Sequence, residues 1–117
     1  MGQRILVADD EPFIVDIVAT VLEDEGHTVL RAYDGSQALA RIENGGCDLL
    51  ITDNMMPRLS GLELIRRLHE QPQLTIPTIL MSAVHPDILP PAPTFFLPKP
   101  FDLEHLLSLV ERLLPVQ

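Results

Sequence analysis

Short apolar runs alternate with amphipathic stretches along most of the chain, and this alternation constrains the fold more than any other feature. The strand-like segments, which are mostly apolar, are residues 5–8, 28–32, 49–52, 76–81 and 94–97. Apolar residues recur at helical spacing in residues 13–22, 36–42, 64–68 and 103–114. A short apolar run is typical of a strand buried on both faces of a parallel sheet, which helices must then cover. The pattern predicts an α/β, doubly wound, five-stranded parallel sheet with helices on both faces, as one domain over residues 1–117.

Capping residues mark the expected helix ends. Pro12 suits the first turn of the first predicted helix, and Gly26 follows the last apolar residue of that pattern. Ser36 is the expected N-cap of the second helix. Ser60 and Glu63 form the capping-box pattern S-x-x-E before the third.

The segment between the fourth and fifth predicted strands is rich in proline. Pro86, Pro90, Pro91 and Pro93 all fall within it. A proline inside a helix removes a hydrogen bond and costs about 3 kcal/mol, and it also restricts the residue before it. We therefore expect at most one helical turn here, followed by extended chain, so that a fourth helix is short or missing and the last helix begins after the fifth strand.

Charge excludes several classes of function. The chain has 8 Lys and Arg against 17 Asp and Glu, a net charge of −9. Such a chain repels nucleic-acid backbones and anionic membranes, so we expect neither partner for this domain. It has no apolar run near the ~20 residues needed to span a bilayer. Without a recognisable secretory signal, and with Cys47 as its single cysteine, a cytoplasmic location is expected, with Cys47 as a small buried apolar residue.

Polar residues end the predicted strands. Asp9 and Asp10 end the first, Asp53 ends the third, Ser82 ends the fourth, and Lys99 follows the fifth. In open α/β sheets, ligands bind beyond the carboxyl ends of the strands. Lys99 is the only lysine in the chain. These residues are therefore expected to form one site.

The residue types in this set indicate phosphoryl chemistry. Three clustered aspartates repel one another unless some are protonated or a cation joins them. An all-oxygen, highly negative ligand set suits a hard divalent ion, and Mg²⁺ is the abundant intracellular candidate. A lysine and a hydroxyl beside such a site would face an anion, as in phosphoryl transfer. A carboxylate can itself be the nucleophile, which gives an acyl phosphate.

Four motifs carry a resemblance to a known family. They are Val7-Ala8-Asp9-Asp10-Glu11, Leu50-Ile51-Thr52-Asp53-Asn54-Met55-Met56-Pro57 with Gly61 after it, Met81-Ser82-Ala83, and Phe96-Leu97-Pro98-Lys99-Pro100-Phe101. In this order, the motifs make the chain similar to the receiver domain of two-component response regulators over essentially its whole length. The resemblance implies the strand order 2-1-3-4-5 and a cis bond between Lys99 and Pro100.

The resemblance also implies residue roles. Asp53 accepts a phosphoryl group from a phosphohistidine on a sensor histidine kinase or phosphotransfer protein. The Mg²⁺ ligands that it implies are Asp10, Asp53, the backbone carbonyl of Met55 and, through water, Asp9.

Further roles follow from the same resemblance. Ser82 hydrogen-bonds the phosphoryl oxygens, and Lys99 pairs first with Asp53 and then with the phosphoryl group. Phe96 occupies the aromatic switch position, where it can act only by packing because it has no hydroxyl. The domain would be a signalling switch with an unknown downstream protein partner, and not an enzyme beyond its own phosphorylation and dephosphorylation.

Two alternatives remain beside the phosphorylatable switch. A docking module of the same fold that works without phosphorylation would not require the charged set at the strand ends. A Mg²⁺-dependent phosphatase with an aspartyl nucleophile would require a second acid two residues beyond Asp53, where this chain has Met55. A stand-alone regulator and a receiver within a longer protein both fit the sequence.

Overall fold

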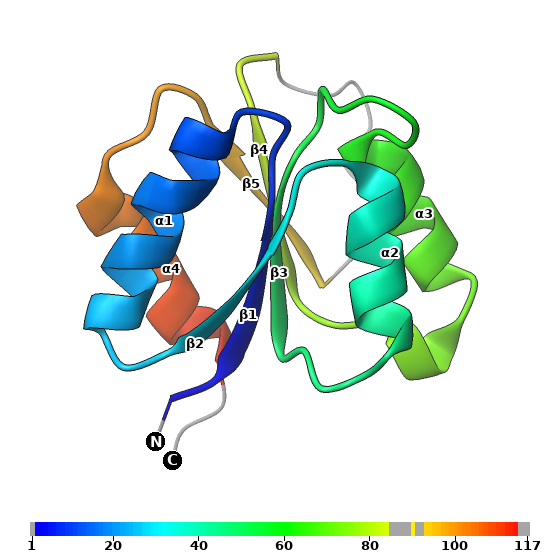
Figure 1. The fold of residues 1–117 in the computed structure, drawn as a ribbon, viewed down its shortest axis with the longest axis horizontal. Helices are drawn as coiled ribbons and strands as arrows, with labels where there is room; N and C mark the ends of the chain where they lie inside the picture. Colours follow the sequence, from blue (N-terminus) through cyan, green and yellow to red (C-terminus); the bar gives the residue numbers. More distant parts are fainter. Residues whose placement is uncertain (1, 85–89, 91–92, 115–117) are drawn as a thin grey trace.

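The computed structural model describes residues 2–84, 90 and 93–114. The strands are β1 (Arg4–Ala8), β2 (Thr28–Ala32), β3 (Leu49–Asp53), β4 (Thr78–Ser82) and β5 (Thr94–Pro98). The helices are α1 (Pro12–Asp24), α2 (Gly35–Glu43), α3 (Gly61–His69) and α4 (Leu103–Leu113), and a short 3-10 helix spans Pro72–Leu74. The sheet lies between two layers, with α1 and α4 on one face and α2 and α3 on the other (Figure 1).

The five strands are parallel and lie in the order β2-β1-β3-β4-β5. This order confirms the predicted doubly wound α/β fold. The strand predicted to begin at Ile76 begins instead at Thr78. It starts after Pro77, which has no N–H to donate to the ladder.

Two apolar cores form because successive strand residues point to opposite faces of the sheet. Ile5 and Ile51 pack with α1 and α4 on one face. Leu6 and Leu50, their neighbours in sequence, pack with α2 and α3 on the other. All four side chains are fully buried, and each such burial stabilises the fold by about 1.5–3 kcal/mol. The unbroken apolar runs of the sequence are therefore explained by a sheet covered on both sides.

The ends of α1 and α3 follow the sequence signals. Pro12 occupies the first turn of α1, and Gly26 adopts a φ of 93° just beyond its end. The Ser60 hydroxyl accepts a hydrogen bond of 3.1 Å from the backbone N–H of Glu63, which caps α3. A serine cap of this kind typically stabilises a helix by about 1 kcal/mol.

The prediction that Ser36 caps α2 is wrong. Asp34 is the N-cap, and its Oδ1 accepts a 2.8 Å hydrogen bond from the backbone N–H of Gln37. The helix begins at Gly35, which places Ser36 inside its first turn. Aspartate and serine are both favoured at N-cap positions. Asp34 is the cap because its backbone is extended, as an N-cap residue requires, and the helix begins at the next residue.

The expected single helical turn between β4 and β5 falls within residues 85–89, outside the described residues. The described residues that flank it, Ala83, Val84, Pro90 and Pro93, belong to no helix. The expected last helix after β5 is present as α4.

Candidate functional site

Three carboxylates meet where β1 and β3 end. Ala8 pairs with Thr52 in the parallel register, so Asp9 and Asp53 follow side by side. One carboxylate oxygen from each of Asp9, Asp10 and Asp53 lies within 4.8 Å of the others. Across the described part of the chain, this is the one such group of three His, Cys, Asp or Glu side chains. The predicted convergence of strand-end aspartates is therefore present.

The three carboxylates differ in their surroundings. Asp9 is fully buried, Asp53 is 6% exposed and Asp10 is exposed. Burial raises the pKa of Asp9 above its ordinary value, and the charge of Asp53 raises it further. The backbone N–H of Glu11, which donates to Asp9 Oδ1 at 2.9 Å, lowers this pKa without reversing the shift. A cluster this rich in negative charge, with only oxygen ligands, fits a hard divalent cation.

Lys99 supplies the positive charge of the site. Its Nζ donates to Asp53 Oδ1 at 2.8 Å and to Asp9 Oδ2 at 3.4 Å. Burial by itself lowers the pKa of Lys99, but its hydrogen bond to Asp53 and the charges of Asp53 and Asp9 outweigh that effect and raise the pKa above its ordinary value. Lys99 is therefore an ammonium at neutral pH.

The backbone also fixes the position of Lys99. Its N–H donates to the carbonyl of Ser82 at 2.9 Å, which ties the end of β5 to the end of β4. The bond between Lys99 and Pro100 is cis, as predicted.

Ser82 and Met55 border a cavity of about 320 Å³ above the carboxylates. Ser82 is 5% exposed, and its Oγ accepts a 3.1 Å hydrogen bond from the backbone N–H of Val84. The side chain of Met55 is 75% exposed. Asp10, Asp53 and Lys99 line the same cavity, so its walls carry both charges as well as a hydroxyl.

The loop after Asp53 is held in place by Asn54 and Gly61. The carbonyl of Asn54 accepts from the N–H of Gly61 at 2.9 Å, and its Oδ1 accepts from the N–H of Leu62 at 3.1 Å. A Cβ added at Gly61 would lie 2.3 Å from the carbonyl oxygen of Asp53. Glycine is therefore required where α3 starts against the end of β3. Sequence reasoning included Gly61 in a motif but missed the role of Asn54.

The other predicted residues lie nearby or apart. Phe96 lies on β5 beside Leu80 and is half-buried. Cys47 lies two residues before β3 and is only half-buried, packed against the core under α2 and α3. Burial raises the pKa of its thiol. The described helices include none that is both long and apolar enough to cross a membrane.

Residues 5–111 match the family described as "Response regulator receiver domain". The chain belongs to this family. The receiver domain therefore accounts for β1 through most of α4, and the predicted resemblance is confirmed.

Curated relatives of this receiver domain are regulatory proteins of greater length. "Transcriptional regulatory protein TrcR" of Mycobacterium tuberculosis is 35% identical over 116 residues, which are 95% of this chain and 45% of that protein. "Response regulator GtcR" of Aneurinibacillus migulanus is 44% identical over 87 residues, which are 74% of this chain and 35% of that protein. The chain thus spans less than half the length of these two relatives.

Solved structures share the fold over nearly the whole receiver domain. The receiver domain of the hybrid histidine kinase CckA is 33% identical, with a TM-score of 0.82 over 96% of this chain and 99% of that one. The chemotaxis response regulator CheY4 of Vibrio cholerae is 27% identical, with a TM-score of 0.84 over 97% of this chain and 100% of that one.

Proposed function

We propose that this receiver domain is a phosphorylatable signalling switch whose acceptor is Asp53. The observation that supports this most is the setting of the Asp53 carboxylate. The ammonium of Lys99 lies 2.8 Å from it, and oxygens of two further carboxylates lie within 4.8 Å. A cavity large enough for a phosphoryl group lies above them. Charge placed in this way is what phosphoryl transfer requires of a protein.

In the proposed reaction, an oxygen of Asp53 attacks the phosphorus of a phosphohistidine on a sensor histidine kinase or phosphotransfer protein. A phosphorus–oxygen bond forms and the phosphorus–nitrogen bond breaks. The imidazole keeps the electron pair of the broken bond and, protonated on its other nitrogen, leaves as a neutral ring. The product is an acyl phosphate on Asp53.

The residues around Asp53 have distinct proposed roles. We propose that Asp10 and Asp53 bind Mg²⁺ directly, that the backbone carbonyl of Met55 is a third ligand, and that Asp9 contacts the ion through water. When bound, the ion supplies charge neutralisation at the transferring phosphoryl group. The hydrogen bonds of Lys99 hold the ammonium beside the same oxygens, where it can pair with the phosphoryl group as it arrives.

We propose that Ser82 and Phe96 convert phosphorylation into a change of shape. The Oγ of Ser82 now accepts from Val84, and its hydroxyl hydrogen can donate to a phosphoryl oxygen. Movement of Ser82 toward that oxygen would free space along β4, and Phe96 on the neighbouring strand would repack into it. The altered surface would then bind a downstream protein.

In this proposal the domain is not an enzyme acting on a separate substrate, because its chemistry is confined to its own Asp53. Both the phosphodonor protein and Mg²⁺ are intracellular, so we place the reaction in the cytoplasm. The net charge of −9 does not favour nucleic acid or an anionic membrane as a direct partner.

Intact mass after incubation with acetyl phosphate and Mg²⁺ tests the proposal. The wild-type protein should gain one phosphoryl group that is lost in alkali. Asp53→Asn should gain none, whereas Asp24→Asn, an exposed aspartate at the end of α1, should be labelled like the wild type. Equal labelling of Asp53→Asn would contradict the assignment of the acceptor. No labelling of the wild type by this donor or by a phosphorylated kinase domain would favour the docking-module alternative.

A further inference from the structure

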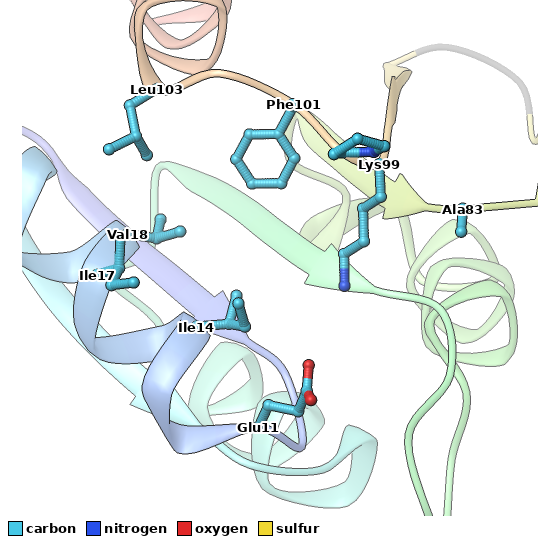
Figure 2. Close-up of a pocket in the computed structure, with 9 residues that line it drawn as sticks. Glu11, Ile14, Ile17, Val18, Ala83, Lys99, Phe101 and Leu103 are labelled. Carbon is cyan, nitrogen blue, oxygen red and sulfur yellow. The ribbon is translucent and has the colours of Figure 1, made fainter.

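A second cavity lies beside the phosphoacceptor site, between the first half of α1 and the chain that links β5 to α4. Its volume is about 480 Å³, within the range of cavities that bind small molecules. Its apolar walls are formed by Ile14, Ile17, Val18, Pro100, Phe101 and Leu103. Figure 2 shows Phe101 and Leu103 facing Ile14 and Ile17 across it.

This apolar pocket adjoins the cavity above Asp53. Glu11, Ala83 and Lys99 line both. Lys99 stands at the boundary, with its Nζ 2.8 Å from Asp53 and the rest of its side chain along the apolar pocket (Figure 2). A molecule with one end over Asp53 would therefore have the apolar pocket beside it.

The proposed chemistry requires space of this kind. With an acyl phosphate as donor, the Asp53 carboxylate forms a bond to phosphorus as the bond from phosphorus to the acyl oxygen breaks. The departing acid keeps the electron pair and leaves as a carboxylate, so charge and atoms balance without another reactant. The phosphoryl group of such a donor would lie over Asp53, and its acyl body would extend to one side of that position.

We propose that the apolar pocket is a subsite for the leaving group, which favours acyl phosphates with an aromatic or branched apolar body over small ones. This inference rests on the proposed phosphorylation of Asp53 and names the class of small-molecule donor, beside the phosphohistidine protein, that the site would favour. The pocket walls offer apolar surface to such a body, and Glu11 at the boundary disfavours a leaving group that carries additional negative charge.

Benzoyl phosphate and acetyl phosphate form the test pair. The rate of phosphorylation of the protein is followed by intact mass at low donor concentration with Mg²⁺, and the benzoyl-to-acetyl ratio is compared between variants. The ratio within each variant cancels changes that affect both donors equally, and comparing the ratio with that of the wild type cancels the intrinsic reactivities of the donors. Ile17→Ser alters the α1 wall, and Leu103→Ser alters the opposite wall independently in case the first variant does not fold.

Phe13→Ser is the matched control. Phe13 is an apolar residue of the same helix, is 71% exposed and does not line the pocket. Small losses of apolar contact in a binding pocket typically change discrimination by tenfold or more. We therefore expect the ratio to fall about tenfold in both pocket variants and to stay at the wild-type value in Phe13→Ser.

Two other outcomes would overturn the inference in distinguishable ways. An unchanged ratio in folded pocket variants, with normal labelling by acetyl phosphate, would leave Asp53 as the acceptor and remove the leaving-group subsite. Failure of both donors to label the wild-type protein, despite Mg²⁺, would count against the proposed acceptor chemistry itself.

Discussion

Replacing Lys99, the only lysine of the chain, by methionine tests how much its positive charge contributes to the stability of the fold, without any phosphorylation. In Lys99→Met the apolar stem keeps a similar length, and the ammonium is lost. Asp9, fully buried, and Asp53, 6% exposed, would then lie close together without their cation. We expect the variant to fold, but with a clear loss of stability when no divalent metal is present.

The size of the loss follows from the contacts of the ammonium. Its two carboxylate partners lie at 2.8 Å and 3.4 Å, and breaking a buried ion pair by removing one partner costs about 3–5 kcal/mol. The Lys99 side chain is 24% exposed, so water screens part of the interaction and the lower end, about 3 kcal/mol, is expected. This is a large share of the ~5–15 kcal/mol by which domains are stable.

The loss should depend on pH. The charge of Lys99 lowers the pKa of Asp9, so its removal places that pKa still further above the unfolded value of 3.8. A folded state that binds a proton more tightly than the unfolded state gains stability as the pH falls. The penalty in Lys99→Met should therefore be largest near pH 7.5 and shrink toward pH 5.

Urea unfolding followed by circular dichroism, with EDTA and then with Mg²⁺, measures these effects. Arg112→Met is the matched control, because it removes an exposed cation on α4 and should change stability by less than about 0.5 kcal/mol. Mg²⁺ should restore part of the loss in Lys99→Met by supplying charge to the same carboxylates. A loss as small as that of the control, or one that does not vary with pH, would refute the electrostatic reasoning.

Three further predictions concern the metal, the loop and a helix cap. Thermal melts should show that ~10 mM Mg²⁺ raises the melting temperature by mass action and that Asp10→Ala removes most of the increase; an equal increase in the variant would place the metal elsewhere. In urea unfolding, Gly61→Ala should lose about 2 kcal/mol, because its Cβ would lie 2.3 Å from the carbonyl oxygen of Asp53. Gly45→Ala, with nothing within 4 Å of its Cβ, should lose only the ~1 kcal/mol of a strained φ, and equal losses would argue against the contact. Asp34→Ala should lose about 1 kcal/mol or more with the α2 cap, and an unchanged midpoint would contradict that role.

The sequence was most informative where a local pattern and a topological rule pointed to the same place. Ile5 to Ala8 and Leu49 to Ile51 are unbroken apolar runs, so both were recognisable as strands buried on two faces. Parallel strands end at a common edge, which is why Asp9 and Asp53 could be predicted to meet although 43 residues separate them.

Prediction from sequence failed where two neighbouring residues could play the same role, and where a contact depends on how segments far apart in the sequence pack together. Asp34 and Ser36 are both good caps, and only the extended backbone at Asp34 selects between them. The hydrogen bond from Leu62 to Asn54 depends on how closely α3 approaches the end of β3. Phe101 and Ile14 line the apolar pocket from segments far apart in the sequence, and no sequence pattern predicts the distance between them.

If Asp53 is phosphorylated as proposed, the charges at the site give a physical reason to expect a change in the shape of this domain. Three carboxylates and the Lys99 ammonium carry a net charge of about minus two, which a divalent cation would balance. Phosphorylation replaces the single charge of the Asp53 carboxylate by the charge of about minus 1.5 to minus 2 that a phosphoryl group carries. If Lys99 and a bound cation were both paired with the carboxylates, neutral donors would have to meet this excess, and the nearly buried hydroxyl of Ser82 lines the same cavity. The requirement for that hydrogen bond would draw the end of β4 toward Asp53, and Phe96 on β5 would repack in response.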